Sequence, residues 1–222
     1  MSWKALCLVT LLFVFAPLAG SAADPVRVLI LGDSLTAGFG LEPQDALPEQ
    51  LERWLNAHGH DVRVINAGVS GDTTTGGAAR LAWVLDGQPQ APDMVVVALG
   101  GNDILRSVPV AVTEQNLTQI IETLQQSEIP VLLAGMLAPP NLGADYAEAF
   151  NTLYPGLADR FDVALYPFFL DGVADRPDLH QPDGIHPNAE GVGVMVERFG
   201  PALVEALTQQ GLLPAETAAA GR

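Results

Sequence analysis

The chain has 222 residues, of which 49% are hydrophobic, and it carries a formal net charge of −16. This length suits one domain of ordinary size, and the hydrophobic content is too high for global disorder. Phosphate groups are bound by clustered lysine and arginine, so the charge argues against a nucleic-acid partner and against adsorption to anionic membranes. A neutral, zwitterionic or acyl-type small-molecule substrate would not be repelled strongly.

Residues 1–23 have the features of a secretory signal peptide. Lys4 supplies a positive charge, residues 5–18 are almost wholly apolar, and Ser21, Ala22 and Ala23 are small. We therefore expect cleavage after Ala23 and export to the periplasm or the medium. The alternative is an uncleaved anchor, but the apolar run is short for a membrane span of roughly 20 residues. We expect no stable membrane insertion after cleavage.

Two residue types occur only once, and both lie in this leader. Cys7 is the only cysteine and Lys4 is the only lysine. The mature chain would thus have no disulfide, no thiol nucleophile and no cysteine metal site. It would also lack a Schiff-base lysine and a lysine-dependent phosphate loop. We expect neither a cofactor nor a metal.

From Asp24 onward, short apolar strands alternate with longer amphipathic helices. The pattern predicts strands near residues 26–31, 61–66, 93–99, 130–136 and 163–166. It predicts helices near residues 47–58, 78–85, 113–127, 144–161 and 188–210, and a short one near 168–173. Pro155 is expected to interrupt or kink its helix, and Gly200-Pro201 to bend the last one. Residues 212–222 resemble a flexible C-terminal tail.

This alternation predicts a single α/β domain over residues 24–211, because no repeat or linker divides it. The expected architecture is a three-layer α/β/α sandwich around a five-stranded parallel sheet. The flavodoxin-like strand order 2-1-3-4-5 is the simplest choice. In such a sheet, ligands bind at the carboxyl ends of the strands, next to the point where the strand order reverses.

The segment Gly32-Asp33-Ser34-Leu35 directly follows the first predicted strand. Taken alone, it is a turn that leads into a helix, with Asp33 or Ser34 as the N-cap. Alternatively, Ser34 is a nucleophile at the ligand-binding edge of the sheet. The choice depends on which groups the other loops at the same edge contribute.

Three other loops at this edge carry polar residues beside small ones, in the segments 66–72, 101–103 and 183–187. Acyl transfer needs a serine, a histidine base, a carboxylate that orients it, and oxyanion donors. Other interpretations are an anion-binding nest over residues 68–77, half a metal site at Asp183, His186 and His180, and a simple turn at Asn102. Asp33, Asp72 and Asp103 are expected to cap turns and brace loops.

Four blocks occur in order: Gly32-Asp33-Ser34-Leu35, Gly71-Asp72, Gly101-Asn102-Asp103 and Asp183-Gly184-Ile185-His186-Pro187. Together they resemble the SGNH hydrolases, also called GDSL esterases/lipases. The segment 64–74 resembles the branch of bacterial multifunctional thioesterase I/lysophospholipase and arylesterase-like proteins. The likeness spans essentially residues 26–209.

The resemblance implies a role for each matched residue. Ser34 would be the nucleophile, His186 the general base and then acid, and Asp183 the group that orients His186. The oxyanion donors would be the N–H groups of Ser34 and Gly71 and the side-chain amide of Asn102. A glycine suits its role because no side chain blocks the approach to its N–H.

The loops 40–47, 104–110, 139–145 and 168–179 are expected to form the substrate walls, with Ile104, Leu105 and Val108 suited to an acyl chain. Leu99 is expected in the core, whereas Met136, Leu137 and the segment 168–170 are either core or pocket wall. The implied function is hydrolysis of carboxylic esters or thioesters, such as aryl esters, short-to-medium acyl esters, lysophospholipids and acyl-CoA-type thioesters. Alternatives are a carbohydrate O-deacetylase and a non-catalytic binding module. A monomer is the default expectation.

Overall fold

The structure is a computed structural model that describes residues 24–215. The predicted signal peptide therefore lies outside the described residues, as does most of the predicted tail. None of the helices within residues 24–215 is long and apolar enough to cross a membrane.

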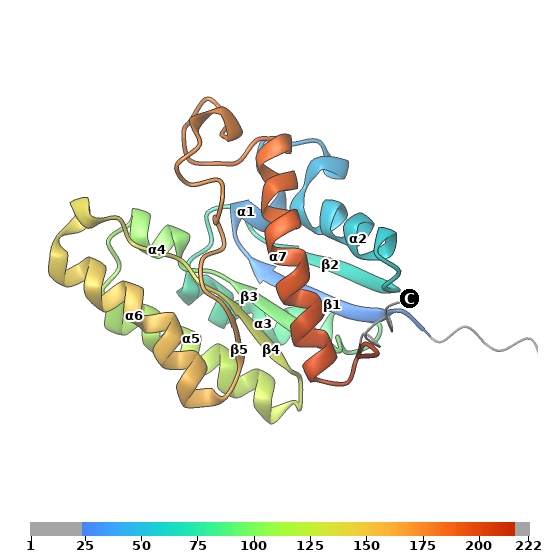
Figure 1. The fold of residues 1–222 in the computed structure, drawn as a ribbon. Coiled ribbons are helices and arrows are strands. Elements are labelled where there is room, and N and C mark those ends of the chain that lie inside the picture. The colour runs from blue at the N-terminus through green and yellow to red at the C-terminus, as the bar shows by residue number, and fades with distance from the viewer. Residues whose placement is uncertain (1–23, 216–222) are drawn as a thin grey trace, which may run out of the picture.

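The sheet has five parallel strands in the order β2-β1-β3-β4-β5, as the sequence predicts (Figure 1). Residue pairing places Gly32 at the end of β1 beside Gly68 of β2 on one side and Ala98 of β3 on the other. The three strands therefore end in register, and the loops that follow them begin side by side at the carboxyl edge of the sheet. The strands are β1 (Val26–Gly32), β2 (Val62–Gly68), β3 (Met94–Ala98), β4 (Val131–Ala134) and β5 (Ala164–Tyr166).

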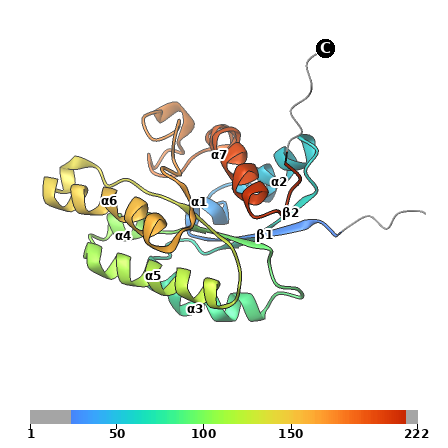
Figure 2. The ribbon, with the colours of Figure 1, turned by 60° about the horizontal axis from the view of Figure 1, so that its bottom comes forward.

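Helices cover both faces of the sheet. Figure 2 shows α2 (Leu47–Ala57) and α7 (Ala189–Gln209) on one face, and α3 (Thr74–Asp86) and α5 (Val110–Gln126) on the other. Helix α6 (Ala144–Phe161) packs beside α5. The remaining helical turns are short: α1 (Ser34–Ala37), α4 (Gly101–Leu105), η1 (Pro43–Asp45), η2 (Pro140–Leu142) and η3 (Pro177–Leu179).

The core is densest around the central strands. Residues 28–31 of β1 and 94–97 of β3 have no solvent exposure, although successive side chains point to opposite faces. Burial on both faces explains why these strands are continuous apolar runs without polar alternation. Leu99, which follows β3, is also fully buried, so its assignment to the core is confirmed.

Several predicted boundaries are wrong for local reasons. Helix α3 begins at Thr74, four residues earlier than expected, because the Thr73 side chain caps it by accepting from the N–H of Gly76. No helix forms at residues 168–173, where the buried Phe169 and Val173 anchor a series of turns instead. Leu213, two residues past the expected end of the domain, is buried.

The two helices with an internal proline are uninterrupted. Helix α6 is continuous through Pro155, so it is not interrupted there, and α7 runs on through Pro201. At Gly200, α7 leaves room for the indole of Trp54 on α2, because a Cβ there would meet the ring at 2.6 Å. The small residue before Pro201 thus serves helix–helix packing.

Close packing at the ends of β1 and β2 fixes the position of α1. A Cβ added at Gly68 would lie 2.5 Å from the backbone nitrogen of Ala37, and one added at Gly32 would overlap the Thr36 side chain. Since the Thr36 side chain is fully buried, it has little room to move. Helix α1 can therefore lie against the sheet only because both strands end in glycine.

We expect Gly68→Ala to destabilise the protein by about 1–3 kcal/mol, because the new methyl group meets backbone that cannot move freely. Gly156→Ala is the matched control, since a Cβ there meets nothing within 4 Å. It lies within α6, where alanine is favoured over glycine by about 0.5–1 kcal/mol. Urea unfolding of both variants measures the difference. Equal stabilities would contradict the proposed steric constraint.

Candidate active site

Helix α1 begins at Ser34, immediately after β1 and its capping residue. The Asp33 side chain caps the helix by accepting a hydrogen bond of 3.0 Å from the N–H of Leu35. First-turn N–H groups have no partner within their helix. Within residues 24–215, the N–H of Ser34 also has no other acceptor. The turn interpretation of this motif is therefore correct, and it leaves a free donor beside the serine hydroxyl.

Three side chains from two distant loops meet at this point. The Oγ of Ser34 lies 2.9 Å from Nε2 of His186, and Nδ1 of His186 lies 2.7 Å from Oδ2 of Asp183. The carboxylate accepts the Nδ1–H, which leaves Nε2 as the acceptor for the serine hydroxyl proton. This is the arrangement in which a histidine can activate a serine.

The Asp183 carboxylate is held by its own loop. Its Oδ1 accepts hydrogen bonds from the backbone N–H groups of Ile185, at 2.9 Å, and His186, at 3.0 Å. The hydrogen bond from the His186 side chain, followed by these two backbone bonds, holds the pKa of Asp183 well below its usual range. The carboxylate therefore stays ionised opposite the imidazole. The three-residue spacing lets one turn supply both side chains.

Asn102 reaches the same site from α4. Its Nδ2 donates a hydrogen bond of 3.2 Å to Oδ2 of Asp33, and both Asn102 and Ser34 line one cavity. An amide nitrogen carries two hydrogens, so one remains for another acceptor. The bond to Asp33 also fixes which end of the amide is the nitrogen. Asp33 is thus placed to orient a donor as well as to cap α1.

Gly71 lies in the turn after β2 and has a φ of +80°. A Cβ at this position would meet only Nη2 of Arg106, at 3.5 Å. The positive φ is thus a backbone reason for glycine here, beside the open approach to its N–H expected from the sequence. Within the described residues, the N–H of Gly71 has no acceptor. Its carbonyl accepts a hydrogen bond of 2.6 Å from Arg106.

The sequence reasoning missed Arg80, which connects the nucleophile loop to the Gly71 loop. Its guanidinium donates to the carbonyl of Gly32 at 3.0 Å, to the carbonyl of Ala67 at 2.8 Å and to the carboxylate of Asp72 at 2.7 Å. These acceptors are the ends of β1 and β2 and the residue after Gly71. Only its position as the first basic residue after the Gly-rich loop could have signalled this role.

Asp103 is fully buried and joins the Asn102 helix to the start of α3. Its carboxylate accepts from the N–H and the hydroxyl of Thr74, at 2.9 and 2.5 Å, and from the hydroxyl of Thr113 at 3.2 Å. The N-terminus of α3 is therefore already occupied by an internal anion. An external anion is therefore not needed at the start of α3, as the anion-nest interpretation of residues 68–77 would have it, and the bracing role expected for Asp103 is confirmed.

A cavity of about 180 Å³ opens beside Ser34, Asn102 and His186. The predicted wall residues Ile104 and Leu105 line it, but Val108 does not. The carbonyl of Val108 instead accepts a hydrogen bond from the hydroxyl of Tyr146. Leu35 and Ile185 are wall residues that the sequence did not indicate. The apolar lining consists of Leu35, Ile104, Leu105, Met136, Leu137, Pro139, Leu170 and Ile185.

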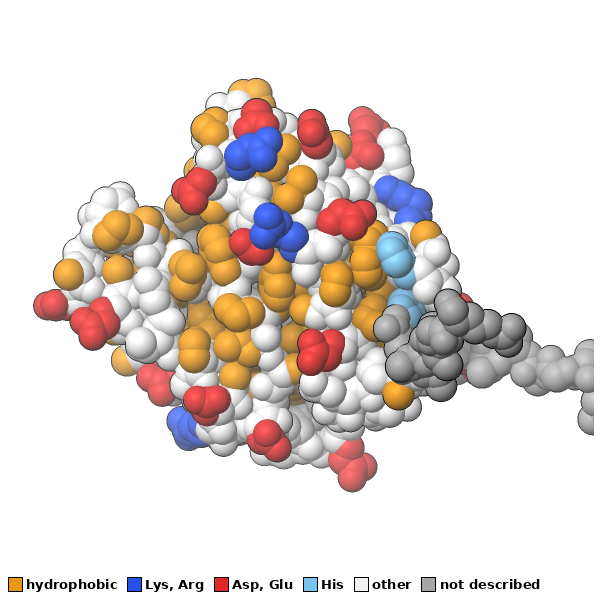
Figure 3. Space-filling model, viewed as in Figure 1, with side chains coloured by type: hydrophobic (Ala, Val, Ile, Leu, Met, Phe, Trp, Pro, Cys, Tyr) orange, Lys and Arg blue, Asp and Glu red, His pale blue; other side chains and the backbone are white. Residues whose placement is uncertain are grey.

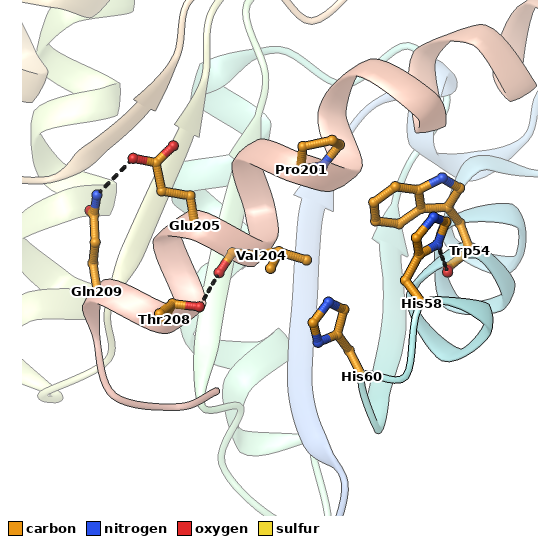
Figure 4. A pocket seen from close by; sticks show the side chains of 8 residues that line it. All are labelled: Trp54, His58, His60, Pro201, Val204, Glu205, Thr208 and Gln209. Atoms are coloured by element: carbon orange, nitrogen blue, oxygen red, sulfur yellow. Dashed lines mark hydrogen bonds between the residues drawn. The ribbon is translucent and has the colours of Figure 1, made fainter. Parts of the chain in front are cut away.

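A larger cavity of about 660 Å³ lies between α2 and α7 (Figure 4). It contains Trp54, His58 and His60, and His58 stacks on Trp54 with ring centroids 3.9 Å apart. It holds neither a serine nor a carboxylate hydrogen-bonded to one of its histidines. We therefore place the candidate site at the smaller cavity, where a nucleophile, a base and an orienting carboxylate are linked.

The third interpretation, a metal site, has no support in the geometry. The Nδ1 of His180 lies 2.9 Å from the carbonyl of Arg176 rather than beside Asp183. In the described part of the chain, no three His, Cys, Asp or Glu side chains gather as metal ligands would. Asp183 and His186 are instead engaged with each other and with Ser34.

A serine, a histidine and an aspartate that are joined by hydrogen bonds at the carboxyl edge of an α/β sandwich are typical of serine hydrolases. The family described as GDSL-like Lipase/Acylhydrolase matches residues 30–194. The chain belongs to this family, and it is a hydrolase.

Three relatives illustrate the similarity. The chain is 39% identical over 200 residues to an arylesterase of Vibrio mimicus, covering 90% of this chain and 98% of the relative. It is 41% identical over 181 residues to the thioesterase 1/protease 1/lysophospholipase L1 of Escherichia coli K12, covering 81% and 83%. The crystal structure of AlinE4, an SGNH-hydrolase family esterase, aligns with a TM-score of 0.72 at 50% identity, covering 84% and 99%.

Variants of AlinE4 have been solved in which one serine or one aspartate is replaced by alanine. The separation of these two positions along that chain equals the separation of Ser34 and Asp183 here.

We expect Asp33→Asn to change how stability depends on pH. Burial raises the pKa of Asp33 to about 6, partly offset by hydrogen bonds from Leu35 and Asn102. The folded protein thus holds this proton more tightly than the unfolded chain, so ionisation costs stability as the pH rises from about 4 to about 6. The variant, which cannot ionise, should gain roughly 2–3 kcal/mol relative to the wild type between about pH 4 and about pH 8.

Urea unfolding of both proteins at the two pH values measures this gain, and a difference that does not change with pH would contradict it.

The same variant should lower kcat more than it raises KM. An asparagine at position 33 presents either an oxygen or an NH₂ group, so it orients Asn102 less strictly than a carboxylate does.

We expect Arg80→Met to lower the free energy of unfolding by about 2–4 kcal/mol, because it removes the guanidinium donor from two carbonyls and from the part-buried carboxylate of Asp72. Arg63→Met is the matched control. Arg63 pairs with Glu52 at 3.5 Å, and its side chain is 64% exposed. Such surface pairs contribute about 0–1 kcal/mol. Thermal or urea unfolding distinguishes the two, and equally small losses would show that Arg80 does not hold the strand ends together.

Proposed function

We propose that this hydrolase cleaves carboxylic esters and thioesters through an acyl-enzyme formed on Ser34. The observation that carries the proposal is the hydrogen-bonded series Ser34–His186–Asp183 beside an apolar cavity. A serine hydroxyl is a weak nucleophile until a base accepts its proton, and the neutral Nε2 of His186 lies within reach of that proton.

In the first half of the reaction, the Oγ of Ser34 forms a bond to the substrate carbonyl carbon while its proton passes to Nε2 of His186. The carbonyl oxygen becomes an oxyanion. The tetrahedral intermediate then breaks the bond to the leaving oxygen or sulfur, which takes the proton from His186. The ionised Asp183 stabilises the imidazolium between these two transfers.

In the second half, a water molecule repeats the attack on the acyl-enzyme. His186 removes one proton from the water as its oxygen bonds to the acyl carbon. Collapse of the second tetrahedral intermediate releases the carboxylic acid and returns the proton to the Oγ of Ser34. The free enzyme is restored, and no other reactant is needed.

Three donors would stabilise the oxyanion: the N–H of Ser34, the N–H of Gly71 and the Nδ2 of Asn102. The two N–H groups lack acceptors within residues 24–215, and the amide of Asn102 is held by Asp33. Donors fixed in advance do not need to reorient as charge develops, and each is worth about 3–4 kcal/mol in comparable sites. The bracing by Arg80 and Asp103 supports this preorganisation.

The cavity favours acyl groups over polar ones, because its walls are mostly aliphatic. Aryl esters, short-to-medium acyl esters, lysophospholipids and acyl-CoA-type thioesters are the substrates we propose. The names of the Vibrio and Escherichia relatives support this range. A carbohydrate O-deacetylase is supported less well, because a sugar ring needs hydrogen-bonding groups that this lining does not offer.

We also propose that the protein is exported and acts as a monomer in the periplasm or outside the cell. The support for export is the sequence of residues 1–23, with its single lysine, apolar run and small residues before Asp24. N-terminal sequencing of the protein isolated from its host identifies the cleavage site. Size-exclusion chromatography with light scattering identifies the oligomeric state.

We expect Ser34→Ala to lower kcat for p-nitrophenyl butyrate by at least about 10³-fold while the fold is retained. Ser127→Ala, at the exposed end of α5, is the control and should behave as the wild type. An organophosphonate should attach to Ser34 alone, as mass spectrometry of the digested protein would reveal. Turnover near the wild-type level, or labelling of another residue, would refute the assignment of the nucleophile.

A further inference from the structure

The exposed large hydrophobic residues are concentrated at one edge of the molecule. Within residues 24–215 there are eight, and six of them lie between the carboxyl end of a strand and the next long helix. Single exposed apolar residues are ordinary on protein surfaces, but a gathered set is not. The six, which we call the collar, are Phe39, Val69, Leu105, Leu137, Leu142 and Ile185.

Local contacts connect the collar to the mouth of the cavity. Leu105, Leu137 and Ile185 line the cavity itself. The ring of Phe39 lies 4.4 Å from the imidazole of His186 between ring centroids. Val69 belongs to the turn that contains Gly71.

Leu142 belongs to η2, which begins directly after the wall residue Pro139. Figure 1 shows two projecting lobes, one of η2 and early α6 and one of residues 167–188, and the space-filling view of Figure 3 shows a hollow between them.

The charges on and around the collar limit the kinds of surface that it can bind. The formal net charge is −16, and exposed acids on the same loops include Glu42, Asp145 and Asp175. The two arginines of these loops are engaged, Arg106 by the carbonyl of Gly71 and Arg176 by Asp178. An anionic lipid surface or an acidic protein would be repelled, whereas a headgroup with an outward quaternary ammonium would be attracted.

We propose that the collar docks the enzyme onto the surface of aggregated zwitterionic lipid, with its apolar side chains inserted among the acyl chains. The mouth of the cavity would then face the lipid, and an acyl chain could pass from the aggregate to Ser34 without crossing water. The docking step rests on the surface alone. Its benefit to catalysis rests on the ester hydrolase function proposed above.

Vesicle binding tests the docking step independently of catalysis. Ser34→Ala protein should sediment with phosphatidylcholine vesicles and less with vesicles that contain phosphatidylglycerol. Adding Val69→Ser and Leu142→Ser should weaken the partition coefficient by about tenfold or more, because two apolar side chains no longer enter the lipid. Adding Trp83→Ser instead should leave the partition coefficient unchanged. Trp83 is the most exposed of the eight, at 77%, but it lies near the C-terminal end of α3 and not in the collar.

Activity tests the consequence in protein with Ser34 intact. Val69→Ser/Leu142→Ser should hydrolyse monomeric p-nitrophenyl butyrate at the wild-type rate, because neither side chain belongs to the catalytic or cavity-lining set. Its rate on lysophosphatidylcholine above the critical micelle concentration should fall about tenfold, and its rate below that concentration should not change. Circular dichroism confirms that the variants are folded.

Three results would overturn docking: no vesicle binding, equal binding by collar and control variants, or preference for the anionic vesicles. If vesicles are bound but no ester is cleaved, docking stands and the proposed function fails. If p-nitrophenyl butyrate is cleaved but vesicles are not bound, the proposed function stands and docking fails.

Discussion

The guanidinium of Arg80 holds together the carboxyl ends of β1 and β2, and the candidate site depends on that connection. One end of the group fixes the carbonyl of Gly32, directly before the loop of Asp33 and Ser34. The other contacts fix Ala67 and the acid that follows Gly71. A planar group with five donors in fixed directions can do this, whereas a single point charge could not. The serine and one of its proposed oxyanion donors are therefore positioned by the same side chain, and neither loop can shift without straining the other.

Three acids around the site brace its loops, and a fourth, Asp183, is hydrogen-bonded to the base His186. Asp33, Asp72 and Asp103 each accept hydrogen bonds from a neighbouring loop or helix, and Asp33 and Asp103 are buried. Burial raises the pKa of Asp33, whereas hydrogen bonds to the imidazole and two backbone N–H groups lower that of Asp183. Similar side chains thus have opposite properties because one is desolvated and the other is surrounded by donors. This difference favours Asp183, rather than Asp33 beside the serine, as the partner of His186.

The sequence predicts the strands and the four polar loops because both depend on local patterns, and the strand order 2-1-3-4-5 is the simplest choice for such an alternation. Apolar runs such as the β3 segment indicate buried strands, and residues directly after strands must lie at the carboxyl edge. Features set by distant contacts could not be predicted. Arg80 reaches an acceptor 48 residues away, and Asp103 reaches the start of α3 29 residues away. The turns at residues 168–173 contain the buried Phe169 and Val173. Val108 does not line the cavity, and its carbonyl is hydrogen-bonded to Tyr146 of α6, 38 residues away.

The polar and apolar parts of this edge share the same loops, and this limits how substrate preference can change. Ile185 is the neighbour of His186, Val69 belongs to the turn of Gly71, and Leu105 is on the same short helix as Asn102. The amide of Asn102 is held by Asp33, the imidazole of His186 by Asp183 and the carbonyl of Gly71 by Arg106, while the adjacent apolar side chains are partly exposed. A substitution of the apolar residue can therefore alter what binds without moving the polar group, provided that the backbone is kept. Insertions in these loops would change both, because the hydrogen bonds that place the polar groups run through the same few residues.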